Sequence, residues 1–146
     1  MIATLVVRRF ALVAMLAIGG CTTVIPYEPP PAMTRDQARA IIRQAFEEQP
    51  EDLRPVTVEI ADDAIRLGFS AAELSFLTGG VTTVAKRESY YFSSLADLRL
   101  EKHMVKTRWQ VWLASRDGSV SRWVVFYEER RAASFLGAVA RMKATN

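Results

Sequence analysis

The chain has 146 residues, of which half are hydrophobic, and its formal net charge at pH 7 is +3. This length suits one domain with a substantial core. Arg8 and Arg9 carry two of the positive charges, so the rest of the chain is nearly neutral and nucleic acid is not an expected partner. The single cysteine, Cys21, excludes a disulfide within the chain.

The first 20 residues have the pattern of a bacterial export signal. Arg8 and Arg9 precede the apolar run 10–18, and Gly19 and Gly20 precede Cys21. A positive flank, an apolar run of about 7–15 residues and small residues at its end mark such a signal. A permanent membrane-spanning helix would need about 20 apolar residues. We therefore expect residues 1–20 to be a signal peptide.

The quartet Ile18-Gly19-Gly20-Cys21 resembles the lipobox of bacterial lipoproteins. The resemblance implies that the signal is cut before Cys21 and that Cys21 carries fatty acyl chains such as palmitate, which anchor the protein to a membrane. Thr22 follows where an Asp would retain the protein at the inner membrane, so the resemblance implies the outer membrane of a Gram-negative cell. A non-lipidated signal peptide and a free buried thiol are the alternatives.

Residues 21–33 are predicted to be a proline-rich tether, because Pro26, Pro29, Pro30 and Pro31 favour extended backbone. Residues 34–146 are predicted to form a single domain, which starts with a helix. Thr34 and Gln37 fit a capping box, and one apolar stripe follows, formed by Ala38, Ile41, Ile42, Ala45 and Phe46. Arginines 35, 39 and 43 form a row that is either solvated or meets lipid phosphates.

Strand patterns fill the middle of the chain. Residues 56–69 predict a hairpin around Asp62-Asp63, residues 70–80 are ambiguous between a short helical turn and a loop, and residues 81–92 and 98–105 predict further strands. Asp117-Gly118 predicts a type I′ turn. The register then pairs Val111 with Val124, Trp109 with Phe126 and Trp112 with Trp123. The closing segment, residues 128–146, predicts an amphipathic helix, with Ala132, Phe135, Leu136, Val139 and Met142 on one face.

This order predicts an α+β fold with an N-terminal helix and a strongly bent antiparallel sheet of six to seven strands, closed by a C-terminal amphipathic helix. The order and the segment "ESYYFSSLADLRLEK" resemble the pleckstrin-homology-like fold, in particular its bacterial and GRAM-type members. The acidic pair Asp62-Asp63 stands where phosphoinositide binders carry basic residues, so the resemblance implies no headgroup site. A cystatin-like or nuclear-transport-factor-like sheet is the alternative.

Motifs for catalysis are scarce. His103 is the single histidine, no serine lies in a G-x-S-x-G elbow, and one His with a lipidated Cys makes a zinc site improbable. We therefore expect no enzyme, no cofactor and no metal.

The expected function is binding of an envelope protein by an outer-membrane-anchored, periplasmic adaptor. The candidate site is an aromatic sheet face formed by Trp112 and Trp123, which Tyr90 and Arg122 extend. Alternatively the partner adds a strand to an exposed sheet edge, or the first helix covers the Trp face. A carrier with a lipid or hydrophobic ligand between the sheet and the closing helix is the second functional class.

Overall fold

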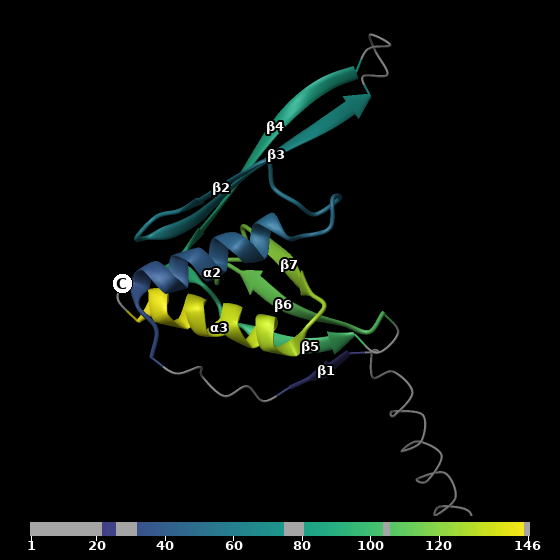
Figure 1. Ribbon diagram of the computed structural model, residues 1–146. Coiled ribbons are helices and arrows are strands. Elements are labelled where there is room, and N and C mark those ends of the chain that lie inside the picture. Colours follow the sequence, from purple (N-terminus) through teal and green to yellow (C-terminus); the bar gives the residue numbers. More distant parts are fainter. Residues whose placement is uncertain (1–21, 26–31, 75–80, 104–105, 145–146) are drawn as a thin grey trace, which may run out of the picture.

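The computed structural model describes residues 22–25, 32–74, 81–103 and 106–144 (Figure 1). The signal peptide and Cys21 lie outside these residues. In chain order the elements are β1 (Thr22–Val24), α2 (Arg35–Glu47), β2 (Thr57–Ile60), β3 (Ala64–Leu74), β4 (Val81–Tyr91), the 3-10 turn η1 (Phe92–Ser94), β5 (Arg99–His103), β6 (Arg108–Ala114), β7 (Ser121–Phe126) and α3 (Glu129–Lys143).

The strands form two separate antiparallel sheets. One has the order β1-β5-β6-β7 and the other the order β2-β3-β4. Helices α2 and α3 lie side by side in front of the first sheet, and β3 and β4 project beyond the second (Figure 1). The predicted single bent sheet, closed by the last helix, is therefore wrong, because the strands divide between two open sheets.

The division has a physical cause in the segment after β4. Phe92 and Leu95 are fully buried, so the chain turns into the core at η1 instead of continuing as a meander. It then crosses to the end of β6, where the Ala96 N–H donates to the Ala114 carbonyl at 2.9 Å. One edge of β5 pairs with β6 and the other with β1, so β5 has no edge left for β4.

Helix α2 begins with the capping box that the sequence predicts. The Thr34 N–H donates to Gln37 Oε1 at 2.9 Å, and the Gln37 N–H donates to Thr34 Oγ1 at 3.2 Å. Each side chain thereby satisfies a backbone donor that the first helical turn leaves free. Arg35 and Arg39 both pair with Asp62, which ties the helix to the turn between β2 and β3.

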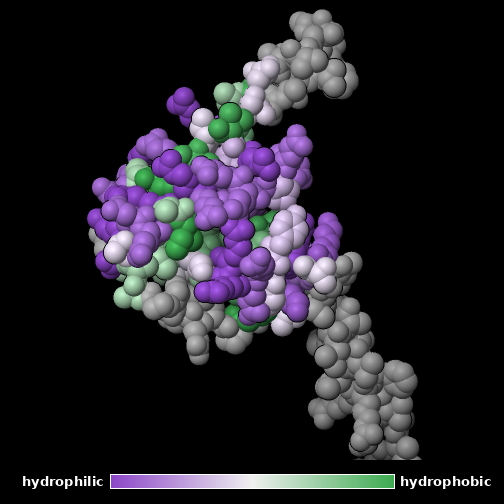
Figure 2. Space-filling model, viewed as in Figure 1, coloured by the Kyte–Doolittle hydropathy of each residue, from purple (hydrophilic) through white to green (hydrophobic). Residues whose placement is uncertain are grey.

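The core lies between the two helices and the first sheet, and buried residues of β2, β3 and β4 join it. Phe135 of α3 is its centre, with ring centroids 5.4 Å from Phe126 on β7 and 5.9 Å from Phe46 on α2. All three rings are buried, and large aromatic side chains contribute much of the energy of such a core. On the outer side of these helices, hydrophilic residues cover most of the visible surface (Figure 2).

The register of the β6–β7 hairpin is confirmed. Val111 pairs with Val124, Trp109 with Phe126 and Trp112 with Trp123. The turn itself is not the predicted type I′, because Gly118 has a positive φ of +71° and Asp117 does not. Instead, the Asp117 carboxylate accepts hydrogen bonds from the Ser115 hydroxyl and from the backbone and side chain of Ser119.

The far halves of β3 and β4 form a two-stranded ribbon, which we call the arm (Ser70–Leu74 paired with Val81–Ala85). Strand β2 pairs with β3 over residues 65–68, so it does not reach the arm. The arm projects away from the helices (Figure 1). Residues 70–74, ambiguous in the sequence, are therefore strand.

The segment predicted as a tether begins with strand β1. Thr22, Thr23 and Val24 pair with His103, Lys102 and Glu101 of β5, and the Ile25 N–H donates to the Leu100 carbonyl at 3.0 Å. Residues 26–31 lie outside the described part of the chain. Neither helix in the described ranges has the length and the apolar run that a transmembrane span requires.

Candidate functional site

Trp112 and Trp123 form the cross-strand aromatic pair that the sequence predicts. Their ring centroids are 4.5 Å apart and their planes are inclined by 49°. Trp112 is partly buried, and Trp123 keeps 37 % of its surface exposed. The two indoles therefore make a fixed aromatic surface, because each restricts the other's rotamers.

The Trp pair lies on the sheet face opposite the helices. Side chains alternate between the faces of a strand, and Phe126, three residues after Trp123, contacts Phe135 of α3. Phe46 of α2 contacts the same Phe135. Both helices thus pack on the Phe126 face, so the alternative in which the first helix covers the Trp pair is wrong.

We call this surface the Trp face; across the central strands it is formed by Arg99, Glu101, Gln110, Trp112, Trp123 and Val125. Gln110 and Val125 are buried on this face. At the β7 edge, the Gln49 side chain accepts a hydrogen bond from the Val125 N–H at 2.9 Å and donates one to the Val125 carbonyl at 3.0 Å. The Trp face thus has an aromatic pair on β6 and β7, with an arginine and a glutamate on the neighbouring strand β5.

Tyr90 and Arg122 do not extend the Trp face. Tyr90 is fully buried and donates a hydrogen bond to Glu88 Oε2 at 2.8 Å. Arg122 projects from the opposite face of β7, donates to Glu88 Oε2 through Nε at 3.0 Å, and reaches the Leu53 carbonyl at 2.9 Å. Its guanidinium also lies 4.0 Å from the ring centroid of Phe69.

This second cluster, the Glu88 network, joins the two sheets. Glu88 is only 5 % exposed, and burial alone would raise its pKa. Hydrogen bonds from Arg122, Lys86 and Tyr90 outweigh that effect and hold the pKa of Glu88 below its ordinary value. Burial, together with the hydrogen bond to Glu88, raises the pKa of Tyr90 far above its ordinary value. Glu88 is thus a buried carboxylate that stays ionised because two charged donors, Arg122 and Lys86, and one neutral donor, Tyr90, bond to it.

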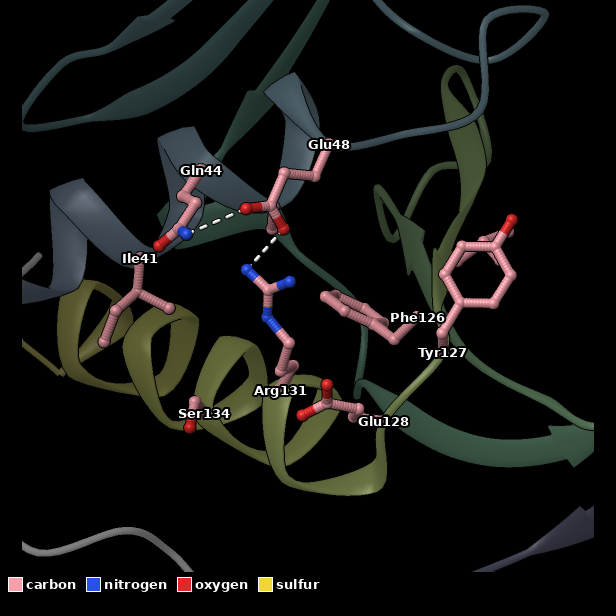
Figure 3. Close-up of a pocket in the computed structure, with 10 residues that line it drawn as sticks. Ile41, Gln44, Glu48, Phe126, Tyr127, Glu128, Arg131 and Ser134 are labelled. Atoms are coloured by element: carbon pink, nitrogen blue, oxygen red, sulfur yellow. Dashed lines mark hydrogen bonds and ion pairs between the residues drawn. The ribbon is translucent and has the colours of Figure 1, made fainter.

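A small pocket opens between α2, α3 and the end of β7, with a volume of about 230 Å³ (Figure 3). Glu48 and Arg131 form an ion pair across its mouth, and Gln44 donates to Glu48 at 2.8 Å. These two hydrogen bonds lower the pKa of Glu48. The ion pair joins two of the three charged residues that line the pocket, and Glu128 is the third.

The space predicted for a hydrophobic ligand, between the sheet and the last helix, is occupied by the protein itself. Phe126, Phe135 and Phe46 fill it with ring contacts. His103 accepts a hydrogen bond at Nδ1 from the Lys106 N–H at 3.3 Å. Within the described ranges, no three His, Cys, Asp or Glu side chains gather into a metal-ligand set.

Two features of the structure were not found from the sequence. Glu88 and Arg122 are 34 residues apart, and no local pattern links them. The arm was missed because residues 70–74 lack the polar and apolar alternation that marks a strand. On the arm and just beyond it, the β4 residues 83–87 are exposed, so this strand also presents an open edge of the kind that accepts a partner strand.

Comparisons with models of known protein families, with curated protein sequences and with solved structures find no match to this chain.

Proposed function

We propose that this protein is a lipoprotein of the bacterial outer membrane, anchored through acylated Cys21, whose periplasmic domain binds an envelope protein without catalysis. The lipobox residues Ile18-Gly19-Gly20-Cys21 support the anchor. The Trp face supports the binding role. The domain thus acts as an adaptor that holds its partner at the membrane.

The observation that carries the binding role is the exposed aromatic pair on a sheet face that both helices leave free. Trp123 is more than one-third exposed, with Trp112 at 4.5 Å beside it. Trp is among the residues most enriched in interface hot spots. A rigid aromatic surface loses little conformational entropy when a partner docks on it, so much of its burial energy is available for binding.

The packing of the core favours this role over that of a hydrophobic-ligand carrier. Ligand sites for drug-sized molecules have volumes of roughly 300–1,000 Å³ and apolar linings. The described pocket is smaller and has the Glu48–Arg131 ion pair at its mouth.

The test is crosslinking in intact cells, followed by affinity purification and mass spectrometry. Trp123→Ala should reduce the recovered envelope partner at least about tenfold, since an aromatic hot spot contributes at least about 1.4 kcal/mol. Val56→Ala is the matched control, because Val56 is an apolar residue with 71 % of its surface exposed, directly before β2 of the other sheet. Cys21→Ser tests the anchor.

Two results would contradict the proposal. If Trp123→Ala and Val56→Ala recover the same partner in equal amounts, with circular dichroism spectra like the wild type, the Trp face is not the binding site. If no specific protein is recovered with the wild type, the adaptor role itself fails. Cys21→Ser should release the protein from the membrane fraction, and an unchanged distribution would reject the lipid anchor.

A further inference from the structure

Strand β1 fixes the position of the predicted lipid anchor relative to the domain. Thr22 pairs with His103 at the last position of β5. Paired residues in an antiparallel sheet have Cα atoms about 4.5–5.5 Å apart, and consecutive Cα atoms are about 3.8 Å apart. Thr22, which directly follows the predicted lipidation site in the sequence, therefore has its Cα atom within about 6 Å of that of His103.

This arrangement leaves no spacer between the anchor and the folded domain. The proline-rich residues follow β1 along the chain instead of separating it from Cys21. Acyl chains on Cys21 enter the lipid, so the corner of the sheet where β5 ends and β6 begins must lie at the bilayer surface. The chain geometry excludes a domain held tens of ångströms away while β1 stays paired.

Four basic residues lie in sequence around the end of β5 and the start of β6, which we call the basic corner (Lys102, His103, Lys106 and Arg108). Arg108 pairs with His103 across the β5–β6 ladder, and the Lys106 N–H donates to the His103 ring. Within the described ranges, Lys102, Lys106 and Arg108 form no ion pair with a carboxylate, and Lys102 lies 5.1 Å from the ring centroid of Trp109. Glu101 directly precedes Lys102 on β5 and offsets part of this charge, but the three basic side chains outnumber it and the corner stays net positive.

Three acids lie near this end of the sheet. Glu101 is the residue before Lys102 on β5, and Glu128 and Glu129 start α3 just after β7, the neighbour of β6. Electrostatic attraction acts over about 8–10 Å at physiological salt. The basic corner falls within that range of the anchor, so its charges act on the lipid surface next to Cys21.

We propose that the basic corner docks on anionic phospholipid headgroups beside the acylated Cys21 and so fixes the orientation of the domain on the membrane. This inference rests on the lipid anchor of the proposed function. Lys106 and Arg108 supply the charge that meets lipid phosphates. The β6–β7 turn, at the other end of the same strands, then points away from the bilayer.

The test uses the lipidated full chain reconstituted into vesicles. Acylation consumes the thiol of Cys21, so one introduced cysteine can be labelled selectively. Thr107→Cys places a fluorophore at the basic corner, and Arg116→Cys places one at the opposite end of the sheet; both positions are exposed. A nitroxide on lipid headgroups should quench the label at 107 and leave the label at 116 unquenched.

Charge is tested in the Thr107→Cys background with matched variants. Lys106→Glu and Arg116→Glu make the same change of charge at the two ends of the sheet. Vesicles of phosphatidylcholine with phosphatidylglycerol should quench the label at 107 more than phosphatidylcholine alone. Lys106→Glu and high salt should remove that difference, and Arg116→Glu should preserve it. Circular dichroism checks the fold of each variant.

The outcomes separate the two proposals. An intact mass without acyl groups on Cys21 rejects the anchor, and with it this inference. If Cys21 is acylated but the labels at 107 and 116 are quenched equally, or neither is quenched, the orientation is wrong while the anchor stands. Quenching at 107 that ignores phosphatidylglycerol, salt and Lys106→Glu rejects the anionic-lipid contact.

Discussion

At the scale of single residues, Glu88 is the buried charge on which the junction between the sheets depends. Its carboxylate accepts hydrogen bonds from Tyr90 and Arg122, and it forms an ion pair with Lys86 at 2.9 Å. Breaking such a pair costs more than forming it contributes, because the remaining charge is left buried without a partner. Arg122 would be that remaining charge.

Glu88→Gln should therefore lower the free energy of unfolding by about 2–4 kcal/mol, measured by urea denaturation. Lys86→Gln is the control, since Lys86 is 68 % exposed and meets the same carboxylate. An exposed ion pair contributes at most about 1 kcal/mol. Equal losses in the two variants would show that burial of the Arg122 guanidinium is not what makes the network costly to break.

The stability difference between the wild type and Glu88→Gln should depend on pH. Folding lowers the pKa of Glu88 below its ordinary value of 4.5. The stability from this group is then complete above that pH and is lost as the pH falls toward the folded-state pKa. The difference in free energy of unfolding between the wild type and Glu88→Gln should therefore become smaller as the pH falls below 4.5. If this difference became larger instead, the folded protein would favour the protonated form of the Glu88 carboxyl group.

At the scale of elements, the β6–β7 hairpin shows what a glycine contributes to a turn. Gly118 has φ of +71°, a left-handed conformation that L side chains rarely adopt. A Cβ atom added there would meet nothing within 4 Å. The effect of a substitution should therefore come from backbone strain alone.

Gly118→Ala should lower the free energy of unfolding by about 1–2 kcal/mol, and Gly118→Asn by less, because Asn tolerates this region. Urea midpoints of the three proteins give the comparison. If Ala and Asn have the same effect, the loss does not arise from φ at position 118.

Local patterns explain which elements could be predicted. The β6–β7 register follows from Asp117-Gly118 and from the alternation of Val111 and Val124, all within one short segment. The division into two sheets depends on β1 occupying the free edge of β5, a contact between residues 22 and 103 that no local pattern encodes. The Trp pair was predictable because both residues lie in one hairpin with a recognisable turn. The Glu88 network was not predictable because its members come from distant parts of the chain.

At the scale of the whole molecule, the described chain has a packed body and a thin extension. The body holds two helices against a four-stranded sheet, whereas the arm is two paired strands. An isolated two-stranded hairpin is marginally stable in water. Local stability should therefore differ strongly between these parts.

Hydrogen exchange should detect this difference. Backbone amides of the arm (Ser70–Leu74 and Val81–Ala85) should exchange at least about tenfold faster than those of β6 and β7, which have neighbours on both sides or a helix above them. Mass spectrometry of peptides from the full chain measures both regions in one sample. Equal protection would mean that the arm is held by a contact outside the described chain.

Strands β3 and β4 run from the body into the arm, and Glu88 lies on β4 three residues from Ala85, the body end of the arm. At about 3.3 Å per residue, the strand reaches roughly 23 Å from Glu88 to Val81 at the far end of the arm. A force applied to the far end of the arm would be transmitted along the two paired strands into the body. The contact of Glu88 with Arg122, which joins the two sheets, would have to resist that force.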